Sequence, residues 1–273
     1  MWTFTADVEE YASAAEAFLL ADPVGNTVPL TVLANIRAGM PAGDASFGWW
    51  TTDGEVRGAA FRTPPLPMAL ARMPVESIAS LVTAWRGEIT EVRGPLELTG
   101  ALSEVLGEPR SVLSERLYRL GTLVVPDTAG HGRLAGVADF PLLVAWFQAF
   151  GEEVGLGMGD PVQQVQHRLA GRQLFMWEAD GVPVSMAALS PAAGGVCRIG
   201  PVYTPPSCRR QGYGAAVTAF ASRVALETRC EQVVLFADLA NPTSNAIYRS
   251  IGYEPVHDYA QVTFGPLPKP GLP

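Results

Sequence analysis

The residues best suited to carry chemistry lie between Val202 and Gly214, where the sequence reads VYTPPSCRRQGYG. An apolar, strand-like run ends there in a loop with two arginines and two glycines, and a helical pattern follows. Gly212 and Gly214 let backbone N–H groups turn inward without a Cβ in the way, and a helix amino terminus adds partial positive charge. Arg209 and Arg210 can add charge-assisted hydrogen bonds. The stretch therefore predicts a pyrophosphate site, although R-x-x-G-x-G alone is also typical of a plain turn before a helix.

Two further polar residues follow the next apolar run, 232–239. Asn241 comes directly after that run, and Tyr248 lies in a short helical segment behind it. A phenol has a pKa of about 10 and can act as a proton donor. The alternatives are that Asn241 only caps the helix and that Tyr248 only packs or makes a hydrogen bond without transferring a proton.

The elements that position these residues alternate between strand and helix patterns. Ala-Asp-Gly at 179–181 separates two apolar runs, as in a tight hairpin, and Asp139 with Pro141 close behind is typical of a helix start. We expect strands over 117–125, 173–178, 182–190, 196–204, 232–239 and 257–264, and helices over 139–154, 161–169, 212–229 and 243–251. Most of the aromatic side chains that could line an acceptor pocket are expected in the core instead, namely Trp49, Trp50, Trp146, Phe147, Phe150 and Trp177.

In this context VYTPPSCRRQGYGAA and VLFADLANPTSNAIYRSIGYEPV resemble the two motifs of the GNAT superfamily of N-acetyltransferases, in the expected order and separation. The resemblance covers roughly residues 117–264. It implies an α/β (α+β) fold with a mixed, mainly antiparallel sheet flanked by helices. It also implies acetyl-coenzyme A as co-substrate, bound in a V-shaped opening between the parallel strands 196–204 and 232–239.

The resemblance further implies a role for each matching residue. Backbone groups at the end of the first strand pair with the pantetheine arm, loop amides hold the pyrophosphate, Asn241 contacts the cofactor arm, and Tyr248 is the catalytic general acid. The implied coenzyme-binding residues are Val202, Tyr203, Thr204, Arg209, Arg210, Gln211, Gly212, Tyr213, Gly214 and Asn241. Strand 196–204 lacks the Glu that several members carry there, so Glu178, Asp238 and an ordered water all remain open as the base.

The N-terminal half resembles the C-terminal half at a constant offset of 127 residues. The residues that match at this offset are Trp50, Asp53, Gly54, Ala60 and Pro64 with Trp177, Asp180, Gly181, Ala187 and Pro191. Further along the chain, and outside this offset, ALSEVLG at 101–107 parallels AIYRSIG at 246–252. We predict a degenerate GNAT-like domain over 1–116, the acetyltransferase domain over 117–264 and a flexible Pro/Gly-rich tail over 265–273. An unrelated helical cap is the alternative for 1–116.

The N-terminal half also lacks the features that would hold a coenzyme. No R-x-x-G-x-G follows the strand-like run 66–71, and Glu76 lies at the start of the next helix, where a carboxylate repels a pyrophosphate. Ser103 stands where the other half has Tyr248. We therefore expect one coenzyme site per chain.

Composition excludes several other classes. The 273 residues carry a net charge of −8 and no Lys/Arg stripe, unlike a nucleic-acid-binding surface. The three cysteines and three histidines show no metal-ligand spacing, so no metal is expected. The first ten residues show no signal peptide, and no apolar run approaches the roughly 18 residues of a membrane span. We expect a cytoplasmic protein without membrane or nucleic-acid partners.

The predicted function is transfer of an acetyl group from acetyl-coenzyme A to a primary amine of a small molecule or peptide, by direct attack. A catalytically silent acyl-coenzyme A-binding regulatory module is the main alternative. A nucleotide-binding protein with the same glycine loop is a third, but the P-loop Lys-Ser/Thr is missing. Neither the acceptor nor the oligomeric state follows from the sequence.

Overall fold

The computed structural model describes residues 1–155 and 159–265, and the chain divides into two compact units. Unit 1 is Met1–Arg116 with the chain from His257 onward, and unit 2 is Leu117–Val256. We expected residues 257–264 in the C-terminal domain, whereas in the structure they belong to unit 1, because residues 259–263 pair with β5 (Glu91–Pro95). The tail expected over 265–273 lies outside the described residues except for Gly265.

Unit 1 is an open sheet with four helices. Its elements are β1 (Trp2–Thr5), α1 (Val8–Leu20), α2 (Thr27–Arg37), β2 (Ser46–Thr52), β3 (Glu55–Arg62), β4 (Met68–Leu70), α3 (Ser77–Ala84), β5 (Glu91–Pro95) and α4 (Leu96–Leu106), with parts of β6 (Ser111–Leu120) and β12 (Tyr253–Thr263). The strand order is β1-β2-β3-β4-β5-β12, in which only β4 and β5 are parallel.

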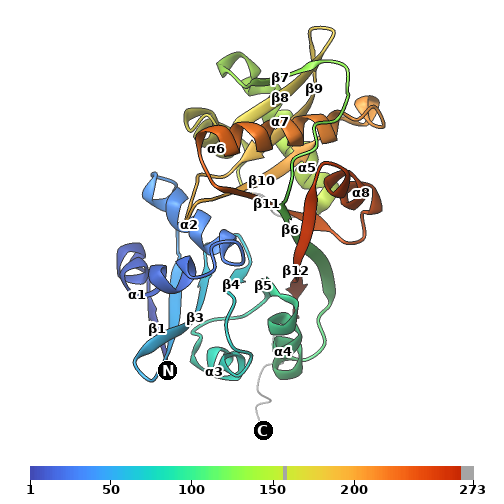
Figure 1. The fold of residues 1–273 in the computed structure, drawn as a ribbon. Helices are drawn as coiled ribbons and strands as arrows, with labels where there is room; N and C mark the ends of the chain where they lie inside the picture. The colour runs from blue at the N-terminus through green and yellow to red at the C-terminus, as the bar shows by residue number, and fades with distance from the viewer. Residues whose placement is uncertain (156–158, 266–273) are drawn as a thin grey trace. The chain divides into compact units, whose positions relative to one another are not determined.

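Unit 2 has the same plan (Figure 1). Its elements are β7 (His131–Leu134), η1 (Val137–Asp139), α5 (Phe140–Val154), α6 (Pro161–Ala170), β8 (Leu174–Ala179), β9 (Val182–Leu189), β10 (Val196–Tyr203), η2 (Pro206–Cys208), α7 (Tyr213–Thr228), β11 (Gln232–Asp238) and α8 (Pro242–Ser250). The strand order is β7-β8-β9-β10-β11-β6, and β10 and β11 form its parallel pair. The predicted fold class, a mixed, mainly antiparallel sheet flanked by helices, is confirmed.

The two units share the same strand order, and one hairpin in each has the same turn and the same register shift. The turn residues Asp53 and Asp180 have φ of 53° and 51°, and each is followed by a glycine with positive φ. The ladder shifts register after Trp50 in the β2–β3 hairpin and after Trp177 in the β8–β9 hairpin. These positions differ by the offset of 127 seen in the sequence. The shared strand order and shared bulge make unit 1 a structural copy of unit 2.

The predicted helices of the C-terminal half are found as α5 to α8, but two strands differ from prediction. The apolar run 117–125 contains strand only to Leu120, because the N–H groups of Gly121 and Val124 donate to carbonyls at the end of α8. The last strand begins at Tyr253 rather than at 257, directly after the left-handed Gly252.

Both faces of the sheet in unit 2 are buried. Alternate residues of β8 and β9 face opposite ways: Phe175 and Ala187 join a cluster with α7, whereas Met176 and Met186 join one with α5. In Figure 1, α7 lies across the front of this sheet. Two-sided burial explains why these strands read as continuous apolar runs. Of the six aromatic residues expected mainly in the core, Trp146, Phe147 and Trp177 are buried in these clusters, whereas Trp49, Trp50 and Phe150 are only partly buried.

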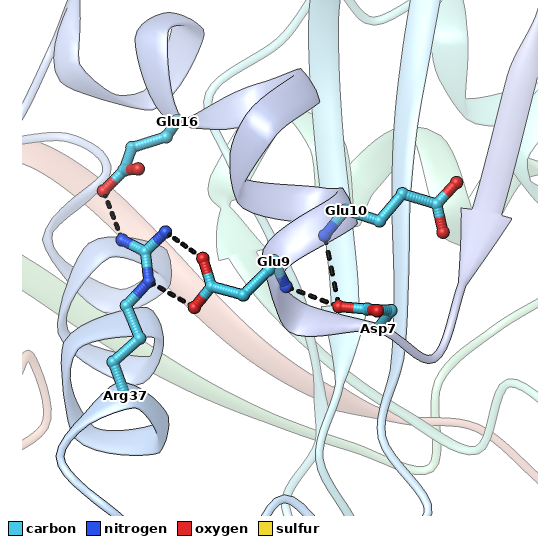
Figure 2. Close-up of polar contacts among 5 residues, drawn as sticks. All are labelled: Asp7, Glu9, Glu10, Glu16 and Arg37. Atoms are coloured by element: carbon cyan, nitrogen blue, oxygen red, sulfur yellow. Dashed lines mark hydrogen bonds and ion pairs between the residues drawn. The ribbon is translucent and has the colours of Figure 1, made fainter.

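In unit 1, ion pairs connect the first two helices, α1 and α2. Figure 2 shows Asp7 accepting from the N–H groups of Glu9 and Glu10 as the cap of α1, and Arg37 of α2 binding Glu9 and Glu16. The guanidinium of Arg37 lowers the pKa of Glu9. Within the described residues of the whole chain, no helix is long and apolar enough to cross a membrane.

Candidate active site

The parallel strands β10 and β11 separate halfway along their length. Their pairing runs from Val196 opposite Gln232 to Ile199 opposite Leu235, yet β10 continues to Tyr203. Pro201 has no N–H to donate, and the β9–β10 ladder shifts register between Ile199 and Val202, which turns the strand. Beyond that point Val202 and Tyr203 pair with β9 on the other side. The two parallel strands therefore part at the position where the resemblance places the coenzyme.

The loop after β10 presents backbone donors. Within the described part of the chain, the N–H groups of residues 210–215 donate to no acceptor. Arg210 and Gly212 both have positive φ, 65° and 83°, which turns successive N–H groups toward one side at the start of α7. Such a concave run of donors at a helix amino terminus favours an anion with several oxygens.

The two arginines of this loop have different surroundings. Arg209 donates from Nε to the carbonyl of Thr204 at 2.9 Å, and its Nη2 lies 2.7 Å from both carboxylate oxygens of Glu153 on α5. Arg210 is exposed and makes no ion pair with any residue that the structure describes. The charge of Arg210 is therefore open to a ligand, whereas that of Arg209 is already matched inside the protein.

Asn241 begins α8 and caps it. Its side-chain oxygen accepts from the N–H of Ser244 at 3.0 Å, which is the capping role considered from the sequence. Its side-chain nitrogen has no partner among the described residues. Asn245, which sequence reasoning missed, lies one turn further on and is buried, with hydrogen bonds to three other residues. An amide in the apolar face of a helix was the signal that could have revealed it.

Tyr248 lies on α8, half-buried against the same apolar cluster as Val202 and Tyr213. Its ring meets that of Tyr253 edge to face, with centroids 6.2 Å apart. Loss of hydration raises the pKa of Tyr248 to about 12. The phenol therefore stays protonated at neutral pH, as a proton donor must.

The remaining predicted coenzyme residues lie together at the end of β10 and the start of α7. Thr204 follows β10, with its Oγ1 2.8 Å from Oγ of Ser185. Gln211 is exposed in the loop and accepts from the hydroxyl of Tyr213 at 3.1 Å. Gly214 is in the first turn of α7, where an added Cβ would lie 3.4 Å from Oγ1 of Thr204.

Both carboxylates considered as a base are held by protein groups. Glu178 accepts from Nε of Arg133 at 2.6 Å, and Arg133 also binds Asp139. Asp238 accepts from the N–H of Ala240 at 2.8 Å at the end of β11. The sequence expectation that Asp238 satisfies neighbouring backbone groups is confirmed.

A pocket lies between α5 and α6. It is lined by Phe147, Gln148, Gly151, Glu152, Gly159, Pro161 and Gln164. None of these is a predicted site residue. Over residues 1–155 and 159–265, no group of three or more His, Cys, Asp and Glu side chains is arranged to hold a metal ion.

The sequence was compared with models of known protein families and with curated proteins. Residues 142–253 match the sequence model of the acetyltransferase (GNAT) family. A search of curated protein sequences gave no match.

Solved structures share the fold over nearly the whole chain. An acetyltransferase of the GNAT family from Colwellia psychrerythraea is 13% identical, with 97% of this chain and 100% of that chain covered and a TM-score of 0.65. A GCN5-related N-acetyltransferase from Sphaerobacter thermophilus is 16% identical, with 96% and 94% covered and a TM-score of 0.62. A tandem GNAT protein from the clavulanic acid biosynthesis pathway is 14% identical, with 97% and 99% covered and a TM-score of 0.56. The fold shared with this tandem protein is consistent with the two similar units of the present chain.

Proposed function

We propose that this protein moves an acetyl group from acetyl-coenzyme A to a primary amine, because residues 142–253 match the sequence model of the acetyltransferase (GNAT) family. The observation that carries the proposal is the run of backbone donors at residues 210–215, directly after the point where β10 leaves β11. A pyrophosphate offers the many acceptor oxygens that such donors need. A pantetheine arm has amides that can pair with the free edge of a strand.

The loop has a glycine at a position where a side chain would be strained. Gly212 adopts a φ of 83°, and a Cβ there would lie 3.0 Å from Oγ1 of Thr128. A side chain at this position would therefore strain the backbone and crowd Thr128. Arg210 would supply the cation, and the amides of residues 210–214 would supply the hydrogen bonds.

In the proposed reaction the acceptor amine attacks the thioester carbonyl, so that a C–N bond forms and the C–S bond breaks. Tyr248 gives its proton to the leaving thiolate, and its raised pKa keeps that proton in place until then. Glu178 and Asp238 are engaged by Arg133 and Ala240. Proton removal from the amine is accordingly assigned to water.

A direct test is release of coenzyme A thiol from acetyl-coenzyme A in the presence of a panel of small amines, amino acids and peptides. We expect thiol release that depends on at least one amine. Acetyl-coenzyme A should also raise the melting temperature, whereas ATP and NAD should not. Equal stabilisation by ATP would refute the acyl-coenzyme A assignment, and stabilisation without any turnover would favour a silent binding module.

A further inference from the structure

Asn245 uses its whole side-chain amide inside the protein. Its Nδ2 donates to the carbonyls of Asp238 and Asn241, each at 2.7 Å, and its Oδ1 accepts from the hydroxyl of Tyr118 at 2.7 Å. The side chain is only 7% exposed, so these bonds are formed away from water. The amide of Asn245 therefore connects the last residue of β11, the residue that caps α8, and β6.

Tyr118 brings a distant part of the chain to this point. It lies on β6, 127 residues before Asn245, and is completely buried. Its hydroxyl donates to Asn245 alone among the described residues. A buried phenol oriented toward a single acceptor fixes the separation between strand and helix, because either group left buried and unpaired would be destabilising.

The same helix carries Tyr248, three residues after Asn245 and on the same face. The hydroxyl of Tyr248 has no hydrogen-bond partner among the described residues, and its ring is held by packing on Tyr253. The position of α8 therefore decides where the Tyr248 hydroxyl lies. Asn245 is the buried polar contact that sets that position relative to β11.

We propose that Asn245 and Tyr118 are positioning residues that hold α8, and with it the Tyr248 hydroxyl, in place for proton transfer. The proposal rests on the proposed function, in which Tyr248 is the general acid. Neither residue touches the reacting groups. Their effect on turnover should therefore pass through Tyr248.

The test is a double-mutant comparison on the full chain. Tyr118→Phe removes one hydroxyl and Asn245→Leu removes the amide, and each is made with and without Tyr248→Phe. With Tyr248 present, we expect kcat to fall about tenfold for Tyr118→Phe and more for Asn245→Leu, since a displacement of about 1 Å can cost roughly 100-fold. The Kd for acetyl-coenzyme A should change less than about twofold. In the Tyr248→Phe background neither change should lower kcat further.

Tyr259→Phe is the matched control. It removes another buried tyrosine hydroxyl bond of 2.7 Å, to the carbonyl of Gly25 in unit 1, so it reports the cost to stability alone. We expect a lower melting temperature with kcat unchanged. If Tyr118→Phe lowers kcat equally with and without Tyr248, or acts only on Kd, the positioning role is refuted. If Tyr248→Phe by itself keeps wild-type turnover, the general-acid assignment fails instead. Should Asn245→Leu not fold, Tyr118→Phe alone decides.

Discussion

Arg209, in the loop between β10 and α7, and Glu153, at the end of α5, form an ion pair. Nη2 of the arginine lies 2.7 Å from both carboxylate oxygens. Both side chains are about half exposed, at 44% and 43%. The pair places a negative charge beside the loop where we expect a pyrophosphate. A coenzyme that binds there must either displace Glu153 from Arg209 or tolerate its charge.

We predict that Glu153→Gln tightens coenzyme A binding by about two- to fivefold, the range for one partly exposed charge interaction of roughly 0.5–1 kcal/mol. The gain should shrink as salt rises. Titration calorimetry of coenzyme A at two salt concentrations measures both. Glu152→Gln is the control, because Glu152 is bound by Gln148 rather than by the loop. Weaker binding in Glu153→Gln would mean that Glu153 holds Arg209 in its working position.

Gly212 and Gly214 should respond differently to the same substitution. Gly212→Ala must adopt a φ of 83°, so we expect a loss of about 1–2 kcal/mol in the free energy of unfolding and weaker coenzyme binding. Gly214→Ala lies in the first turn of α7 with an ordinary contact, so it should keep or slightly raise stability. Denaturant unfolding and acetyl-coenzyme A titration measure the contrast. Equal stability in the two variants would contradict the left-handed loop.

Tyr248→Phe should lower turnover by about 10²- to 10⁴-fold while leaving coenzyme affinity nearly intact, because the ring still packs and only the proton donor is lost. The raised pKa of Tyr248, about 12, also predicts how kcat depends on pH. The protonated phenol is retained as pH rises through the ordinary tyrosine value of about 10, so Tyr248 should cause no loss of kcat there. A pH–rate profile under chemistry-limited conditions gives the answer, and a fall near pH 10 absent from Tyr248→Phe would contradict it.

Unit 1 should bind no coenzyme, because it lacks the glycine loop and three N–H groups of the corresponding segment already have acceptors. After β4, the N–H of Arg72 donates to the side chain of Asn26 at 3.0 Å, and Arg72 pairs with Asp22. The N–H groups of Ser77 and Ile78 at the start of α3 find carbonyls in the preceding turn. Calorimetry of the full chain should therefore give one site.

The complementary measurement uses a loop variant of unit 2. Gly212→Val should abolish acetyl-coenzyme A binding at all accessible concentrations, with no residual weaker site. A fragment ending at Arg116 is unsuitable as a control, because it lacks the part of β12 that pairs with β5. Two sites in the wild type, or a second site surviving in the variant, would show that unit 1 binds coenzyme.

Local sequence patterns were enough to predict the hairpin turn, the loop before α7 and the internal repeat. Asp180-Gly181 predicted the hairpin because the pair accepts positive φ, and both residues have it. The glycines and arginines at 209–214 predicted the loop at the start of α7, since backbone freedom and charge are properties of single residues. The repeat was also visible, because bulge and turn positions keep a fixed spacing along the chain.

Only the tertiary structure decided which groups remain open for a ligand. Arg209 and Arg210 are identical in type, yet Glu153, 56 residues away, matches the charge of the first. Asn245 became informative only when folding placed Tyr118 beside it. Residues 257–263 joined unit 1 because β12 pairs there with β5. Each of these three outcomes depends on contacts between residues far apart in the sequence. Burial and distance decide which hydrogen bonds and ion pairs form, and local periodicity encodes neither burial nor distance.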